Sequence, residues 1–230
     1  FSSQKIPKPG EGDIALSLKH PLLVETLEQG VNLQGETFLV MEFVEGPMLR
    51  DLIIEKSPLL EGKRMPLTIS TAEAIRVVHE AGFYHRDLCP HNFIVAPDGE
   101  SVKLIDFGLS IPATEDFRKP GNRTGKADYM APELIRRMPT DHRVDIFAWA
   151  VTMFELWTGE LPWVGGSGMQ AAQRAAFKPP EIRSIAPQVH PRLASVIDSC
   201  LQSNPDHRHG TMEEILIRLR QAERELDSPA

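Results

Sequence analysis

Apolar residues recur at every third or fourth position between residues 67 and 81. This period is that of an α-helix with one buried face, because 3.6 residues complete each turn. The predicted face consists of Ile69, Ala72, Ile75, Val78 and His79. Gly82 follows directly, and glycine readily takes the left-handed conformation found just after a helix. The pattern therefore predicts a helix over residues 67–81.

A second stretch, residues 141–158, is apolar on all sides rather than on one face. Its large aromatic residues are Phe147, Trp149, Phe154 and Trp157. This pattern is typical of a helix buried in the middle of a domain. The most apolar part, residues 146–157, is too short to span a bilayer. We therefore expect a core helix and no membrane segment here.

The remaining patterns are shorter. Weaker helical spacing is found at residues 13–19, 48–55, 169–177 and 191–201, and Thr211 with Glu214 forms a capping box for a last helix that ends at Leu226. Strand patterns occur at residues 23–30 and 36–44 and, around a Pro-Asp-Gly turn, at residues 93–95 and 102–105. Residues 1–11, 111–126 and 204–208 lack regular spacing and are expected to form loops or turns. The mixture predicts an α+β fold without internal repeats.

Composition narrows the possible functions. The 230 residues are 41% hydrophobic and 25% charged, which is ordinary for a globular protein. The net charge of −7 argues against nucleic acid as a partner, because no positive field attracts a phosphate backbone. Two cysteines, Cys89 and Cys200, make no disulfide framework and suit the reducing cytoplasm. The chain begins at Phe1 and shows no signal peptide, so we expect a fragment whose targeting or membrane-tethering segments lie elsewhere.

The residues that could carry out catalysis lie next to the predicted strand pair at residues 93–95 and 102–105. Asp87 and Asn92 precede the pair, and Asp106 follows its second strand. Phosphoryl transfer needs a carboxylate that accepts the hydroxyl proton, and an amide and a second carboxylate that hold magnesium. Asp87 fits the first role as general base. Asn92 and Asp106 fit the second role as the metal ligands.

These residues stand in the order H-R-D-L-x-x-x-N and D-F-G, followed by Ala-Pro-Glu at residues 131–133. The ordered set resembles the protein kinases, and Pro90 favours the Ser/Thr type over the Tyr type. The resemblance covers residues 17–226. It implies a protein-kinase-like α+β fold, with a partial small lobe at residues 1–44 (the end of helix C, the last strands and the start of the hinge) and a mostly helical large lobe at residues 45–230. It also implies ATP and Mg²⁺ as cofactors and a protein substrate.

The same resemblance assigns roles in nucleotide binding. The backbone of Glu42 and Val44 would bind adenine at the hinge, and Met41 would hold the gatekeeper position. Ile94 would form the floor of the adenine pocket, although core packing explains an isoleucine equally well. Asp106 would contact the phosphates of ATP through magnesium.

Further positions would have structural or regulatory roles by resemblance. Glu11 stands where the helix glutamate of the family lies, but its glycine neighbours make a plain loop carboxylate an equal alternative. Arg86 would bind a phosphate on the segment that holds Thr114 and Thr124. The other positions are His85, Phe107 and Gly108 in the two motifs, Asp145 bound to the catalytic-loop backbone, and Glu133 paired with Arg208.

Three departures from the family pattern bear on activity. No glycine-rich phosphate loop or strand lysine precedes Glu11, and Lys5 and Lys8 are too close to it to serve, so slow or absent turnover is expected. Cys89 replaces a lysine, and Lys126 replaces a threonine. Lys126 could supply the charge missing at Cys89, or it could simply face solvent.

A pseudokinase or docking module is therefore the alternative function. A small-molecule phosphotransferase is a third hypothesis. The Ala-Pro-Glu triplet, Asp145 and Arg208 argue against it, since together they resemble a platform for peptide substrates.

Overall fold

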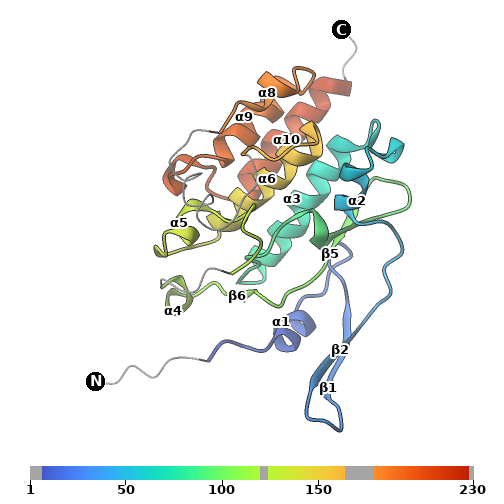
Figure 1. The fold of residues 1–230 in the computed structure, drawn as a ribbon, viewed down its shortest axis with the longest axis vertical. Helices are drawn as coiled ribbons and strands as arrows, with labels where there is room; N and C mark the ends of the chain where they lie inside the picture. The colour runs from blue at the N-terminus through green and yellow to red at the C-terminus, as the bar shows by residue number, and fades with distance from the viewer. Residues whose placement is uncertain (1–6, 120–123, 164–178, 228–230) are drawn as a thin grey trace.

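The structure is a computed structural model that describes residues 7–119, 124–163 and 179–227. The helix expected at residues 169–177 lies outside the described residues. Most of the described chain forms a helical body, and a two-stranded hairpin projects from one end of it (Figure 1). This arrangement matches the α+β class expected from the sequence.

Four helices form the body: α3 (Arg64–Glu80), α6 (Arg143–Thr158), α9 (Pro191–Cys200) and α10 (Met212–Asp227). Helix α3 contacts α6 and α10, and α9 contacts α6 and α10. Helix α6 is buried on all sides, as its apolar pattern predicts, and Trp149 and Phe154 are fully enclosed. Shorter helices are α2 (Leu49–Ile54), α5 (Pro132–Ile135) and α8 (Ile182–Ile185), together with α1 and α4, which are described below.

Helix α3 begins earlier than the apolar spacing suggests. Pro66 lies in its first turn, where the backbone N–H groups have no partner within the helix, so a proline costs little there. Gly82 follows the helix with a φ of 84°, as expected of the residue that ends it. The expected helices at residues 48–55, 141–158 and 191–201 are confirmed with small shifts of their ends.

The described strands form three antiparallel pairs. Strand β1 (Thr26–Val31) pairs with β2 (Thr37–Met41), β3 (Phe83–Tyr84) with β6 (Ile111–Pro112), and β4 (Phe93–Val95) with β5 (Val102–Leu104). Single 3₁₀ turns lie at Pro58–Leu60, Pro90–Asn92 and Pro205–His207. The strand pair β4–β5 brings the Asn92 end of one strand beside the Asp106 end of the other.

The expectation of an irregular loop over residues 111–126 was wrong in part. Strand β6 and the four-residue helix α4 (Glu115–Arg118) lie within it. Strand β6 has two residues that pair with Phe83 and Tyr84, and a pair this short leaves no alternation to detect in the sequence. Residues 120–123 lie outside the described ones.

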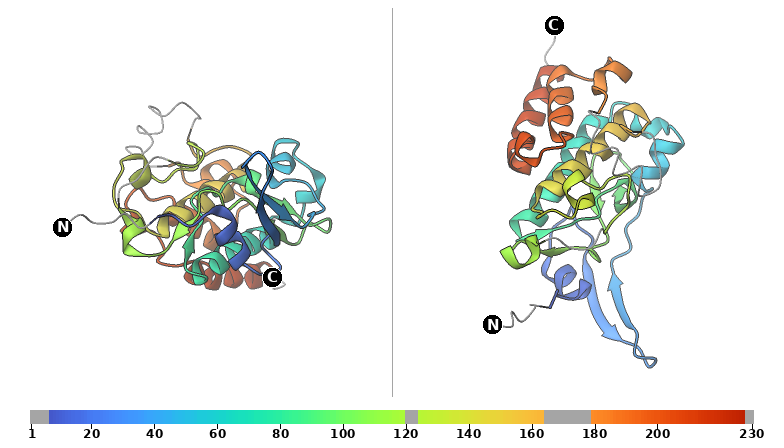
Figure 2. Two further views of the ribbon diagram at one scale, coloured as in Figure 1. Left: turned by 90° about the horizontal axis from the view of Figure 1, so that it is seen from below. Right: turned by 60° about the vertical axis from the view of Figure 1, so that its left-hand side comes forward.

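Helix α1 (Glu11–Ser17) packs against the hairpin β1–β2 (Figure 2). Gly12 is buried at this contact, and a Cβ atom there would lie 1.9 Å from Oε1 of Gln29. A larger side chain there would require the ends of the Gln29 and Leu39 side chains to move. Of the two alternatives for Glu11, the structure shows the helical one.

The last helix is capped differently from the predicted box. The Thr211 hydroxyl accepts a hydrogen bond from the Glu214 N–H at 3.1 Å, but the Glu214 carboxylate accepts from the Gly210 N–H at 2.9 Å. Only the first half of the capping box is thus formed as predicted. Within the described residues, no helix has both the length and the apolar character needed to cross a membrane.

Candidate active site

A buried carboxylate holds the catalytic loop in place. Asp145, at the start of α6, is fully enclosed and accepts hydrogen bonds from the backbone N–H groups of His85 at 2.8 Å and Arg86 at 2.7 Å. Burial alone would raise the pKa of Asp145, but the hydrogen bond with His79, the nearby histidine charges and the Arg86 N–H keep that pKa below its usual value. The carboxylate therefore stays ionised and fixes the loop.

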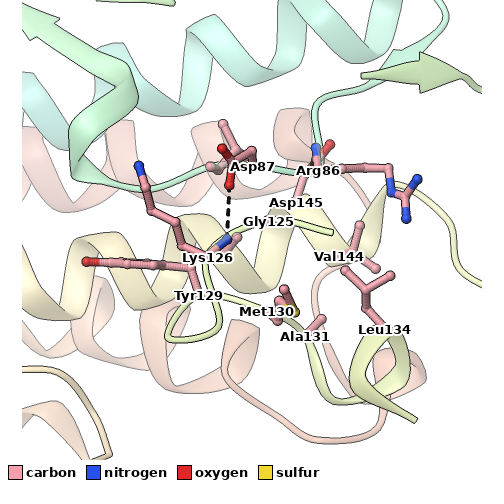
Figure 3. Close-up of a pocket in the computed structure, with 12 residues that line it drawn as sticks. Arg86, Asp87, Gly125, Lys126, Tyr129, Met130, Ala131, Leu134, Val144 and Asp145 are labelled. Atoms are coloured by element: carbon pink, nitrogen blue, oxygen red, sulfur yellow. Dashed lines mark hydrogen bonds between the residues drawn. The ribbon is translucent and has the colours of Figure 1, made fainter. Parts of the chain in front are cut away.

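The loop is also held in an uncommon backbone conformation. Arg86 has a φ of 69°, a value that a residue with a side chain rarely adopts. Such conformations persist only where the surroundings fix them, and they are common at functional sites. Here the two bonds to Asp145 supply that constraint, and the side chains of Asp87 and Arg86 point in different directions (Figure 3).

Asp87 and Asn92 are in direct contact. The Asn92 side-chain amide donates to the Asp87 backbone carbonyl at 2.7 Å and lies 3.4 Å from the Asp87 carboxylate. The amide nitrogen faces Asp87, so the Asn92 side-chain oxygen is left for another partner. The Asp87 carboxylate also accepts from the backbone N–H of Lys126 at 3.1 Å (Figure 3).

Asp106 lies beside this pair. The backbone N–H of Ile105 donates to the Asn92 carbonyl at 2.9 Å, which places the next residue, Asp106, alongside Asn92. Asp106 is exposed and has a φ of 66°, and Phe107 after it is buried against the His85 ring. The backbone thus places Asp106 next to Asn92, which itself contacts Asp87.

The donor set fits magnesium. Among the described residues, no group of three or more histidine, cysteine or acidic side chains could hold a metal ion alone. Magnesium needs less from the protein, because it keeps waters and is commonly bound by one or two side-chain oxygens and by substrate phosphates. The side-chain oxygen of Asn92 and the exposed carboxylate of Asp106 can provide these protein ligands.

Lys126 and Cys89 meet across the site. The Lys126 ammonium lies 3.1 Å from the Cys89 sulfur, which is fully buried. Burial raises the pKa of the Cys89 thiol, and the lysine counters part of that rise. The structure thus brings a cation to the position where the family carries a lysine in the catalytic loop. This contact favours the first of the two alternatives raised for Lys126.

Glu11 and Lys8 lie against the Asp106–Gly108 segment. The Lys8 ammonium donates to the Gly108 carbonyl at 2.7 Å. Burial and the negative charge of Asp106 raise the pKa of Glu11, while Lys8 lowers it. Burial and the charge of Arg86 lower the pKa of Lys8. From the sequence, Lys8 is too close to Glu11 to be the strand lysine of the family. In the structure, Lys8 nevertheless contacts the Asp106–Gly108 segment.

The remaining predicted positions are distributed around this centre. Arg86 is partly buried, and the side-chain oxygen of Thr124 is buried without a hydrogen-bond partner in the described part of the chain. Thr114 is exposed at the start of α4. Glu133 and Arg208 form a two-point ion pair at 2.7 and 2.8 Å, with the two side chains 5% and 0% exposed.

The hinge positions lie apart from the Asp87 pocket. A cavity of about 200 Å³ is lined by Glu42, Val44 and Ile94, together with residues behind the hinge such as Pro21 and Lys103. The Glu42 N–H donates to the Glu25 carbonyl at 2.9 Å. In the described residues, neither the Glu42 carbonyl nor the Val44 N–H makes a hydrogen bond. Met41 ends β2 and is 48% exposed.

Sequence reasoning missed two supporting contacts. His79, assigned to an apolar face, makes a 2.9 Å contact with Asp145. Tyr129 donates to Glu155 at 2.6 Å, beside the pocket that holds Asp87. Both contacts could have been suspected from the sequence, because buried polar groups need hydrogen-bond partners. His79 lies in an otherwise apolar helix face, and Glu155 lies in an otherwise apolar helix.

Comparison with known proteins agrees with this geometry. The family model described as "Protein kinase domain" matches residues 3–218. Serine/threonine-protein kinase pkn3 of Myxococcus xanthus is 30% identical over 226 residues, which are 94% of this chain and 41% of the relative. PknB of Mycolicibacterium smegmatis is 30% identical over 93% of this chain, and PknL of Mycobacterium tuberculosis is 32% identical over 84%. The chain spans less than half the length of each of these relatives, 36% of PknB and 48% of PknL.

Proposed function

We propose that this chain, which belongs to the protein kinase domain family, transfers the γ-phosphate of ATP to Ser or Thr hydroxyls of protein substrates. The observation that carries the proposal is the contact between Asp87 and Asn92, with Asp106 alongside. A pseudokinase without catalysis is not favoured, because all three groups are retained and the relatives compared are named as serine/threonine kinases.

Asp87 is the proposed general base. Its carboxylate lies between the Asn92 amide and the Lys126 N–H, which fix its orientation before a substrate arrives. A hydroxyl that approaches within hydrogen-bond reach can give its proton to this carboxylate as the phosphorus–oxygen bond forms. Holding the base in line is most of what the protein contributes to phosphoryl transfer.

Asn92 and Asp106 are the proposed ligands of the divalent ion, which we take to be Mg²⁺. When bound, the ion neutralises charge on the phosphate oxygens during transfer. The Ile105–Asn92 backbone bond fixes the spacing of the two ligands. Phe107, the residue after Asp106, packs against the His85 ring and supports the same segment.

Lys126 is the proposed source of positive charge at the catalytic loop. Its ammonium reaches Cys89, where the family carries a lysine, and its backbone binds Asp87. A cation here can stabilise the charge that develops on the transferred phosphate.

The hinge is the proposed adenine site. The Glu42 carbonyl and the Val44 N–H are an acceptor and a donor without partners in the described residues, which suits the edge of a purine ring. Ile94 faces the same cavity, and Met41 ends the strand that leads into the hinge. The small lobe (residues 1–44) and the large lobe (residues 45–230) would then meet at the nucleotide.

Two regulatory roles and a location complete the proposal. A phosphate on Thr124 would bind Arg86, whose guanidinium is partly buried and has a side-chain N–H without a hydrogen-bond partner in the described residues. Glu11 would support the Asp106–Gly108 segment from α1.

A reducing, cytoplasmic location is supported by the two free cysteines, and nucleic acid is not a proposed partner.

The test combines nucleotide binding with phosphate transfer. We expect magnesium-dependent ATP binding, and slow transfer of labelled γ-phosphate to a Ser/Thr peptide but not to the matched Tyr peptide, because no glycine-rich phosphate loop or strand lysine precedes Glu11 in this chain. Asp106→Asn should abolish the magnesium dependence of binding, whereas Asp98→Asn, an exposed turn aspartate, should not change it. ATP binding that is independent of magnesium, or unaffected by Asp106→Asn, would contradict the proposal.

A further inference from the structure

Three basic side chains from separate parts of the chain lie close to the proposed catalytic base. Arg50 is in α2, and His91 is in the 3₁₀ turn that follows the catalytic loop. Lys126 is in the segment before the Ala-Pro-Glu triplet. We call these three residues the basic cluster.

Helix α2 brings Arg50 towards His91. The helix contacts the Pro90–Asn92 turn, and the backbone of Met48, just before the helix, forms a bridge with that of Ile94. The helix that carries Arg50 is therefore held against the turn that carries His91.

Lys126 approaches the same turn from the activation segment. Its ammonium lies 3.1 Å from the sulfur of Cys89, which directly precedes the turn, and its backbone N–H donates to the Asp87 carboxylate at 3.1 Å. The side chains of Lys126 and Arg86 point away from each other (Figure 3). The basic cluster is thus adjacent to the base and separate from Arg86.

Charges around His91 are more positive than negative in effect. Burial lowers the pKa of His91 first, and the charges of Lys126 and Arg50 lower it further. The charges of Asp51 and Asp87 raise this pKa, but each acts less strongly than either cation. An additional carboxylate would therefore be attracted to this place.

Arg50 can turn to a new partner at little cost. Its side chain is 42% exposed, and its ion pair with Asp51 has a distance of 3.8 Å, a kind of exposed pair that contributes little. The nearby carboxylate of Glu155 already accepts the Tyr129 hydroxyl at 2.6 Å. His91 is partly buried, so one part of its ring stays in reach of a bound peptide.

We propose that the basic cluster selects protein substrates that carry an aspartate or glutamate close to the acceptor Ser or Thr. The inference rests on the proposed function, because Asp87 then marks the place of the acceptor hydroxyl. An extended peptide advances about 3.3 Å per residue, so a carboxylate within about three residues of the acceptor can reach the cluster. The planar guanidinium of Arg50 suits a carboxylate, which it can bind through two N–H groups.

The test compares two labelled nine-residue peptides with a central serine. One carries aspartate on both sides of the serine, and the other carries lysine at the same positions. Fluorescence anisotropy with the full chain should show binding of the Asp peptide about tenfold tighter. The net charge of −7 alone would favour the Lys peptide, so this preference reports the local cluster. Equal affinity, or tighter binding of the Lys peptide, would overturn the proposal.

Phosphate transfer to the same peptides separates this inference from the proposed function. The ratio of kcat/KM between the Asp and Lys peptides should follow the ratio of their affinities. A binding preference without any transfer would support the inference and contradict the proposed function. Transfer at equal kcat/KM to both peptides would overturn the inference alone.

Variants then locate the site. Arg50→Glu and His91→Glu should each reduce the preference for the Asp peptide about fivefold or more, whereas Arg50→Lys should keep most of it. The control is Arg218→Glu on α10, because Arg218 is 47% exposed and its pair with Glu214 also has a distance of 3.8 Å. An unchanged preference in the Arg50→Glu, His91→Glu double variant, or an equal loss in the control, would overturn the proposal. A loss of ATP affinity in Arg50→Glu with the peptide preference intact would do the same.

Discussion

The catalytic loop and the hairpin β1–β2 differ in the burial of their side chains. Asp145 under the catalytic loop is fully buried, yet it accepts hydrogen bonds from the His85 and Arg86 backbone. On the hairpin, Phe38 and Val40 are each 41% exposed although they are apolar. The difference shows that the helical core satisfies the buried polar groups of the proposed reaction centre, while the hairpin leaves apolar side chains exposed to solvent.

Breaking the buried ion pair should have the largest effect on stability. Glu133→Gln leaves the enclosed Arg208 guanidinium without its counter-charge, so the free energy of unfolding should fall by about 3 to 5 kcal/mol. Urea unfolding measures the loss. The control is Glu80→Gln in the exposed pair with Arg76, at 2.6 Å, which should cost less than about 1 kcal/mol. Similar losses in both variants would show that burial does not set the strength of the pair.

Removing the Lys126 ammonium should affect turnover rather than folding. Lys126→Met removes the charge at Cys89, and kcat for phosphate transfer should fall by roughly 100-fold because charge on the transferred phosphate loses a partner. Lys119→Met, at an exposed lysine that pairs with Asp116, is the control and should keep full activity. An unchanged kcat in the Lys126 variant would show that the charge at Cys89 contributes nothing to phosphate transfer.

Acid should weaken the anchor of the catalytic loop. The pKa of Asp145 is lowered in the folded chain, so its stabilisation is complete above the pKa of an unfolded aspartate and is lost as pH falls through the lower folded pKa. Asp145→Asn should cost about 2 kcal/mol of unfolding free energy at pH 6 and less at pH 3. Urea titrations at both values measure this difference, with Asp98→Asn as the exposed control. A cost that does not change with pH would contradict the ionised state assigned to Asp145.

Shortening an apolar side chain should lower the free energy of unfolding less on the hairpin than in the core. Phe38→Ala removes a half-exposed ring and should lower the free energy of unfolding by less than about 1 kcal/mol. Phe154→Ala, at a fully buried position of α6, should cost about 3 to 5 kcal/mol. Thermal unfolding of both variants measures the contrast. A large loss from Phe38→Ala would contradict the half-exposed position of this ring.

Much of the fold follows from local patterns. Helix α6 is apolar on all sides and α3 carries a regular apolar face, so both are visible in the sequence. Strand β6 and helix α4 are not, because two to four residues leave no period and their stability comes from partners distant in the chain, such as Tyr84 for β6.

The candidate site was predictable to a similar degree. The order of Asp87, Asn92 and Asp106 indicates phosphoryl transfer, because the residue types and their spacing match that chemistry. The contact of His79 with Asp145 and the approach of Lys8 to Gly108 join residues 66 and 100 positions apart. Such contacts depend on how the elements pack, and no local pattern reports them.

The central claim is that Asp87 is the base of one phosphoryl-transfer site formed with Asn92 and Asp106. Single-turnover transfer of labelled γ-phosphate to a Ser/Thr peptide tests it most directly, with magnesium and ATP at saturating concentrations. Asp87→Asn should slow transfer by roughly 100- to 10,000-fold while ATP affinity and the unfolding temperature stay unchanged. Transfer at the wild-type rate by the Asp87→Asn variant would contradict the account.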